Sequence, residues 1–122
     1  ENKVVMVRRD NSKKIFLPME NLTLEVDKLL EDIQHNLFLK AKDFLEKNTF
    51  VPKDYEELLD ILKNQKGMVK VSWCEEGLCE DKIKEETGAT SCCVPLDQIG
   101  LQKNCIVCGE EAKKVILFAK HY

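Results

Sequence analysis

Four cysteines in two close pairs constrain the fold of this chain more than any other feature of its sequence. Cys74 and Cys79 have four residues between them, and Cys105 and Cys108 have two. Two close pairs separated by one short structural unit are the arrangement of a zinc site in which four thiolates surround one ion. Gly109 follows the second pair and allows the chain to bend beneath its sulfurs. The spacing therefore predicts a metal site at these four residues.

A site of this kind is structural, because four thiolates fill the coordination shell of Zn²⁺ and leave no position for water or substrate. Two other interpretations remain open: four free buried thiols, or a redox-active pair at Cys105 and Cys108. A redox Cys-x-x-Cys pair requires a helix after its first cysteine to lower the pKa of that thiol. Disulfides are a further alternative for six cysteines, but disulfide scaffolds are usually smaller and richer in loops. The metal site is the interpretation we favour.

The composition favours one domain, or one domain with part of a neighbour. The chain has 122 residues, of which 43% are apolar, and this is enough for a packed core. Its net charge of −3 argues against a dedicated nucleic-acid arm, which is normally basic. No segment approaches the roughly 18 apolar residues of a membrane helix, and Glu1 opens neither with an initiator Met nor with a signal peptide. We therefore expect a piece of a longer cytoplasmic protein, with no membrane partner.

The first half of the chain predicts a hairpin followed by one long helix. Short β-prone runs at residues 4–7 and 15–17 flank a turn. Between residues 22 and 47, apolar side chains recur every three or four positions, which is the period of an amphipathic helix. Residues 48–52 are then predicted to be a connector between this helix and the second half of the chain.

The second half predicts an α+β fold. Asp54 and Glu57 form a capping box that begins a short helix. Alternating apolar residues at 69–73 predict a strand that leads into the first cysteine pair. The remaining expected elements are a helix at 79–87 with Gly88 as its left-handed stop, a strand at 90–94 and a central strand at 115–119. Together they predict one mixed β-sheet packed on helices, with a four-cysteine zinc subdomain.

Other reactive side chains have simpler interpretations. Cys92 and Cys93 are adjacent in a predicted strand, so their side chains should point to opposite faces of the sheet. We expect both to be small, buried or half-buried apolar residues. His35 lies among polar neighbours and should be solvated. No serine or cysteine near His121 forms the nucleophile–base arrangement of a catalytic site. The sequence therefore suggests no catalytic and no cofactor-binding residue.

Several stretches of the chain together match the pattern of one known family. They are residues 73–91, 105–109, 112–114 and 118–122, together with 7–10 and 32–38 in the first half. These stretches resemble the prolyl-tRNA synthetases of the archaeal/eukaryotic type. The resemblance covers nearly the whole chain and is to the C-terminal domain of these enzymes. The four zinc cysteines of the family match Cys74, Cys79, Cys105 and Cys108.

The resemblance also implies a domain organisation. Residues 1–20 would be the end of the anticodon-binding domain, residues 21–48 a linking helix, and residues 49–122 the C-terminal zinc-binding domain. That domain would have the fold of the C-terminal half of translation initiation factor three, with the order β-α-β-α-β-β. The terminal carboxylate of Tyr122 would reach toward the catalytic domain.

The resemblance implies an enzyme of which this chain is a non-catalytic part. The family's class II aminoacyl-tRNA synthetase is a cytoplasmic homodimer that joins proline to tRNA(Pro), using ATP and Mg²⁺ through a prolyl-adenylate. Its catalytic domain is absent here, so the partners of this chain would be the catalytic and anticodon-binding domains of the same enzyme. The alternative is a stand-alone zinc-ribbon module that binds nucleic acid or protein. The acidic balance and the lack of interleaved basic and aromatic residues argue against nucleic-acid binding.

Overall fold

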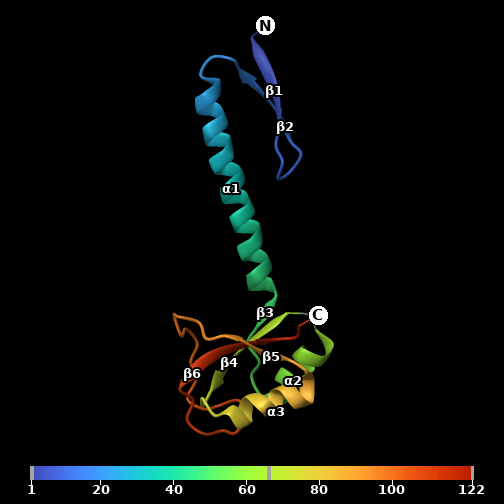
Figure 1. Cartoon of the computed structure of the whole chain (residues 1–122), viewed down its shortest axis with the longest axis vertical. Coiled ribbons are helices and arrows are strands. Elements are labelled where there is room, and N and C mark those ends of the chain that lie inside the picture. The colour runs from blue at the N-terminus through green and yellow to red at the C-terminus, as the bar shows by residue number, and fades with distance from the viewer. Residues whose placement is uncertain (1, 66, 122) are drawn as a thin grey trace. The chain divides into compact units, whose positions relative to one another are not determined.

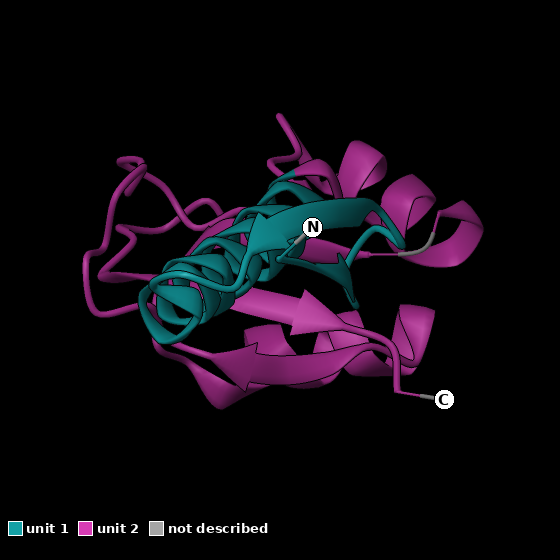
Figure 2. Ribbon diagram, turned by 90° about the horizontal axis from the view of Figure 1, so that it is seen from above, with its two compact units in different colours: residues 1–46 teal, residues 47–122 magenta. Residues whose placement is uncertain are grey.

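The chain consists of two compact units. A computed structural model describes residues 2–65 and 67–121, and the units are Glu1–Glu46 and Lys47–Tyr122, coloured separately in Figure 2. The elements, labelled in Figure 1, are β1 (Lys3–Val7), β2 (Lys14–Pro18), α1 (Leu22–Lys47), β3 (Thr49–Phe50), α2 (Tyr55–Asn64), β4 (Met68–Trp73), α3 (Gly77–Thr87), β5 (Thr90–Cys93) and β6 (Lys114–Ala119). This mixture of helices and strands confirms the predicted α+β class.

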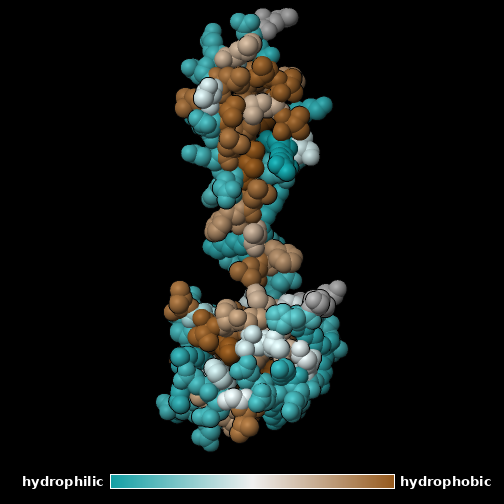
Figure 3. All heavy atoms as spheres, viewed as in Figure 1, coloured by the Kyte–Doolittle hydropathy of each residue, from teal (hydrophilic) through white to brown (hydrophobic). Residues whose placement is uncertain are grey.

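The first unit consists of the predicted hairpin and the predicted long helix. Strands β1 and β2 pair antiparallel, with Val5 opposite Phe16. Helix α1 follows, and none of its residues is buried. Many of its large apolar side chains are exposed, among them Leu30, Leu37 and Phe38, and Figure 3 shows apolar atoms gathered over this unit. The segment with the apolar period thus forms the predicted helix, but its apolar side chains form no buried core.

A charged network ties the hairpin turn to α1. The guanidinium of Arg8 donates from Nε and Nη2 to the carboxylate of Asp10, at 3.0 and 2.8 Å, and from Nη1 to Asp32 of the helix. Asn36 donates to the same Asp10 carboxylate. The hydrogen bond from Arg8 holds the pKa of the Asp10 carboxyl well below its usual range. Charge-assisted hydrogen bonds, which are stronger than neutral ones, therefore join the two elements.

The second unit contains a four-stranded sheet with the order β3-β4-β6-β5. Strand β6 pairs antiparallel with both β4 and β5, so the prediction of a central strand at 115–119 is confirmed. Strand β3 pairs parallel with β4 over two residues only. The prediction of a connector at 48–52 was wrong at Thr49 and Phe50, because two residues are too few to show an alternating pattern.

Helices α2 and α3 share one apolar core with the sheet. On β4 and β6, Val69 lies directly opposite Phe118, and Val71 lies opposite Ile116. These side chains pack with residues from α2 and with Ile83 of α3, which is fully buried. The contributing residues of α2 are Leu58, Ile61 and Leu62. The core thus joins the two inner strands to both helices, close to the place where the cysteines lie.

The predicted helix signals are present. Asp54 caps α2 by accepting from the backbone N–H of Glu57 at 2.8 Å, and the Glu57 carboxylate reaches back to the N–H of Lys53 at 2.7 Å. Helix α3 ends at Gly88, whose φ of 74° is left-handed. It begins at Gly77, two residues before the predicted start at Cys79.

A long connection joins β5 to β6. One side chain of this connection makes the hydrogen bonds to β6 that a neighbouring strand would otherwise make. Strand β5 pairs with β6 only as far as Leu117. Beyond that point the amide of Gln98 accepts from the N–H of Val115 at 2.6 Å and donates to the carbonyl of Val115 at 3.3 Å. Both backbone groups of Val115 are therefore satisfied by a single side chain from the loop.

Candidate metal centre

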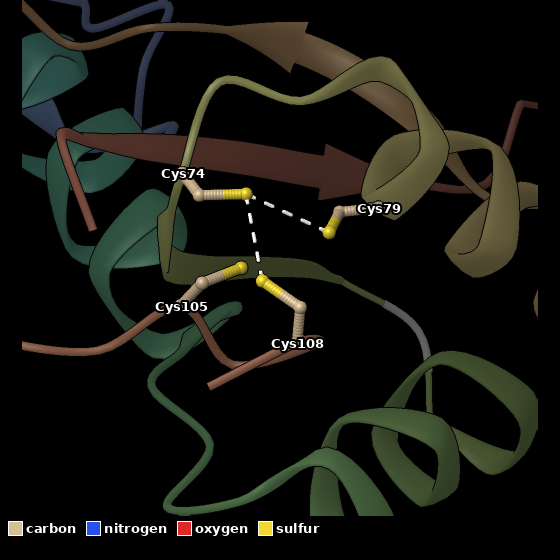
Figure 4. Close-up of side chains that lie close together, drawn as sticks. All are labelled: Cys74, Cys79, Cys105 and Cys108. Atoms are coloured by element: carbon tan, nitrogen blue, oxygen red, sulfur yellow. Dashed lines mark hydrogen bonds between the residues drawn. The ribbon is translucent and has the colours of Figure 1, made fainter. Parts of the chain in front are cut away.

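Three separate segments bring the four predicted ligands together. Cys74 follows the end of β4, and Cys79 lies in the first turn of α3. Cys105 and Cys108 lie in the connection between β5 and β6. Figure 4 shows their side chains pointing toward one another.

The spacing of the sulfurs fits a tetrahedral ion. The Sγ atom of Cys74 lies 3.6 Å from that of Cys79 and 3.7 Å from that of Cys108. All four Sγ atoms lie within 4.8 Å of one another. Four thiolates at the Zn–S distance of about 2.3 Å would stand about 3.8 Å apart in a regular tetrahedron. A disulfide requires about 2.05 Å between sulfurs, and all four residues are free cysteines. The donor set and its dimensions therefore fit zinc.

A tight turn positions the second pair. The N–H of Gly109 donates to the carbonyl of Cys105 at 2.9 Å, and the N–H of Cys105 donates to the carbonyl of Glu110 at 2.7 Å. Gly109 has a φ of 77°, which is left-handed and favours glycine. Burial raises the pKa of the Cys105 thiol, but hydrogen bonds from the backbone N–H groups of Cys108 and Val107 bring it down to about 7. The turn therefore stabilises a thiolate at Cys105.

The first pair is held by the loop that joins β4 to α3. The carbonyl of Glu76 accepts from the indole of Trp73 and from the N–H of Cys79, both at 3.1 Å. Burial raises the pKa of the Cys74 and Cys79 thiols. A buried thiolate is unfavourable unless a positive charge lies beside it. These two residues therefore provide ligands whose ionised form requires a cation.

Backbone hydrogen bonds join the cysteine turn to the sheet. Ile106 donates to the carbonyl of Ser72 at 3.1 Å, and Lys113 donates to that of Trp73 at 2.8 Å. The Lys114 ammonium pairs with the Glu75 carboxylate at 2.5 Å. The hydrogen bond from Lys114 lowers the pKa of Glu75. Both cysteine pairs are thus attached to the end of β4, so their relative position is fixed by the sheet.

The remaining sequence candidates lie elsewhere. Cys92 and Cys93 are exposed, so the prediction that they are buried or half-buried was wrong. The reason is that β5 is an edge strand with a bulge at this point. His35 is exposed, as predicted. Tyr122 lies outside the described residues. Within residues 2–65 and 67–121, no helix combines the length and apolarity needed to span a bilayer.

Sequence reasoning did not find the side chains that support the centre. Trp73 and Lys114 act through contacts with Glu76 and Glu75, which lie between the first two cysteines. The sequence does place a tryptophan next to the first cysteine pair. Its hydrogen bond to Glu76 depends on the geometry of the turn, which the sequence does not show. These contacts fix the loop between the ligands and supply no ligand themselves.

Comparison with known proteins identifies the family. The model of the C-terminal region of prolyl-tRNA synthetase matches residues 55–122. The chain is 44% identical over all its 122 residues to proline–tRNA ligase 2 of Bacillus cereus, and 42% identical to the proline–tRNA ligase of Ruminiclostridium cellulolyticum. It spans 26% of the length of each.

A solved structure has a similar fold. Prolyl-tRNA synthetase from Cryptosporidium parvum, complexed with halofuginone and AMPPNP, matches with a TM-score of 0.90 and 37% identity. The match covers 99% of this chain and 26% of that one. From the family model, the curated relatives and this structure together, the chain belongs to the prolyl-tRNA synthetase family and corresponds to its C-terminal region.

Proposed function

We propose that the four clustered cysteines hold one structural Zn²⁺. The observation that carries this proposal is the convergence of four Sγ atoms, from Cys74, Cys79, Cys105 and Cys108, within 4.8 Å. When bound, the ion supplies the positive charge that keeps these thiols ionised, and it links three segments of the second unit. A shell of four thiolates leaves no open position. The centre therefore stabilises the fold and takes no part in chemistry on a substrate.

Metal analysis tests this assignment. Protein purified under reducing conditions should contain one zinc ion per chain, and replacement by Co²⁺ should give the absorption bands of a tetrahedral cobalt–thiolate site. Iron in place of zinc, or a cobalt spectrum typical of six oxygen ligands, would contradict the proposal.

We further infer that the chain is the non-catalytic C-terminal part of a proline–tRNA ligase. The enzyme, of class II, would attach proline to tRNA(Pro) in the cytoplasm through a prolyl-adenylate, with ATP and Mg²⁺ bound by its other parts. The support is 44% identity over the whole chain to a proline–tRNA ligase of which the chain spans 26%. The residues that activate proline would then lie in the remaining three quarters.

The domain organisation follows from the same inference. Residues 1–20 would belong to the anticodon-binding domain, residues 21–48 would link it, and residues 49–122 would form the zinc-binding domain. The order β3-α2-β4-α3-β5-β6 supports the likeness of the last domain to the C-terminal half of initiation factor three. Tyr122 would extend its terminal carboxylate toward the catalytic domain, and a full-length enzyme with residues added after Tyr122 should then lose activity. Unchanged aminoacylation by the extended enzyme would remove this role from Tyr122.

Proline-dependent exchange of pyrophosphate into ATP tests the enzymatic assignment. The full-length protein should catalyse the exchange, and the 122-residue chain alone should not. Exchange by this chain alone would contradict the non-catalytic role. A full-length protein that contains the chain and does not activate proline would contradict the assignment to a proline–tRNA ligase.

A further inference from the structure

A second pair of thiols lies outside the metal centre, on strand β5. Cys92 and Cys93 are adjacent, exposed and free of disulfides. Strand β5 is at the edge of the sheet, beside β6. Because both residues are exposed, reagents in solution can reach them.

A bulge places these two residues opposite a single partner. Ser91 lies opposite Phe118 and Cys93 lies opposite Leu117, so β5 advances two residues while β6 advances one. Cys92 is the extra residue. In a regular strand, neighbouring side chains point to opposite faces, but a bulge interrupts this alternation and redirects a side chain. The side chains of Cys92 and Cys93 therefore do not have to point to opposite faces of the sheet, as they would in a regular strand.

The surroundings of Cys92 keep its thiol protonated. Partial burial, and to a lesser extent the neighbouring Cys93, raise the pKa of the Cys92 thiol. Its Sγ atom lies 3.8 Å from the carbonyl oxygen of Thr90, which precedes it on the same strand. Cys92 therefore remains a protonated thiol at neutral pH.

We propose that Cys92 and Cys93 form a bidentate site for trivalent arsenicals. An arsenoso compound, R–As=O, reacts with the two thiols to form two As–S bonds. The arsenic–oxygen bond breaks, and the two thiol protons leave with the oxygen as one molecule of water. Arsenic remains trivalent, so the step requires neither an oxidant nor a reductant. The product is a ring closed by two neighbouring residues.

Two neighbouring thiols bind such a compound far more tightly than one thiol does. After the first As–S bond forms, the second thiol is held close by, and a linked second contact of this kind can increase affinity by about 100-fold or more. The thiols of the metal centre differ, since Cys74, Cys79 and Cys105 are at most 6% exposed. Cys108 is exposed, but it would be engaged by zinc like the other three. The site on β5 is therefore expected to react first in the zinc-loaded chain.

The test uses the zinc-loaded 122-residue chain, with phenylarsine oxide as the probe. The chain is incubated with the arsenical and an excess of a monothiol, which removes adducts held by one sulfur. Bound arsenical is then measured by intact-protein mass spectrometry, and zinc is measured in the same sample. The matched variants are Cys92→Ser, Cys93→Ser and the double variant, each of which replaces an exposed thiol by a hydroxyl of similar size.

We expect the parent chain to retain one arsenical with its zinc in place. Each single variant should bind at least 100-fold more weakly, and the double variant should bind no more tightly than the single ones. Retention of the arsenical by the double variant would overturn the proposal. So would uptake by the parent chain that occurs only as zinc is released, because the metal centre would then be the site of reaction.

Discussion

Replacement of Cys105 by serine tests how strongly the proposed zinc supports the second unit. Cys105 is 3% exposed, and its thiol has a pKa of about 7 because, although burial raises it, backbone N–H groups of the turn stabilise the thiolate. Serine has nearly the same size, but its hydroxyl does not ionise in this range. The variant therefore removes one ligand from the cluster and leaves the packing around it almost unchanged.

The expected loss can be worked out from the four-sulfur geometry. Structural zinc sites in small peptides bind with about 10–16 kcal/mol, and one of four equivalent ligands accounts for about 2.5–4 kcal/mol of it. This loss corresponds to a decrease in zinc affinity of about 100- to 1,000-fold. Because zinc binds the folded state, the free energy of unfolding falls by a similar amount when free zinc exceeds the Kd of both the parent and the variant. For a unit of this size, each kcal/mol corresponds to about 4–8 °C in Tm.

Competition with a coloured zinc chelator measures the affinity, and circular dichroism measures the Tm. Cys93→Ser is the matched control, since it changes the same atoms at an exposed position outside the cluster. The control should alter the free energy of unfolding by less than about 0.5 kcal/mol. Equal zinc affinity and equal Tm in the two variants would refute the assignment of Cys105 as a ligand.

Three further changes test the packing and the polar contacts. Ile83→Ala, at a fully buried position of α3, should lower the free energy of unfolding by about 2–5 kcal/mol in a urea titration. Gly88→Ala should cost about 1–2 kcal/mol in the same assay, because its φ of 74° strains any residue with a Cβ although no atom obstructs that carbon. Asp10 has a lowered pKa in the folded unit, so the stability that its pairing with Arg8 contributes is present above the unfolded pKa of about 4 and is lost as the pH falls. NMR of the Arg8 side chain during an acid titration should show its pairing with Asp10 disappear as the pH falls. Asp10→Asn should remove this pH dependence of the Arg8 signals.

Local signals in the sequence predicted most elements of the fold. The helix at 22–47 and the hairpin before it followed from their apolar periods, and Asp54 and Gly88 marked helix ends through their own chemistry. The closeness of the cysteines within each pair followed from their short spacing, and the preference of zinc for four thiolates predicted that the two pairs meet. Apart from this meeting of the two pairs, each of these features depends on residues within a few positions of one another.

The features that could not be predicted depend on distant residues. The two residues of β3 form a strand only because β4 lies beside them. Exposure of Cys92 and Cys93 depends on a bulge, which is defined by the register with β6 and not by the residues themselves. The contact between Arg8 and Asp32 joins positions far apart in the sequence. Apart from the four-cysteine pattern, nothing in the single sequence indicated which distant segments meet.

The side chain of Gln98 has a consequence for the behaviour of the protein at high concentration. An unpaired strand edge is a template on which a second molecule can add a strand and begin to aggregate. The amide of Gln98 occupies that edge of β6 at Val115, where β5 no longer pairs. Gln98→Leu should open the edge and shorten the time before light scattering rises in concentrated solution, whereas the exposed loop change Leu96→Gln should not. One side chain in a long loop would thus keep the molecules apart.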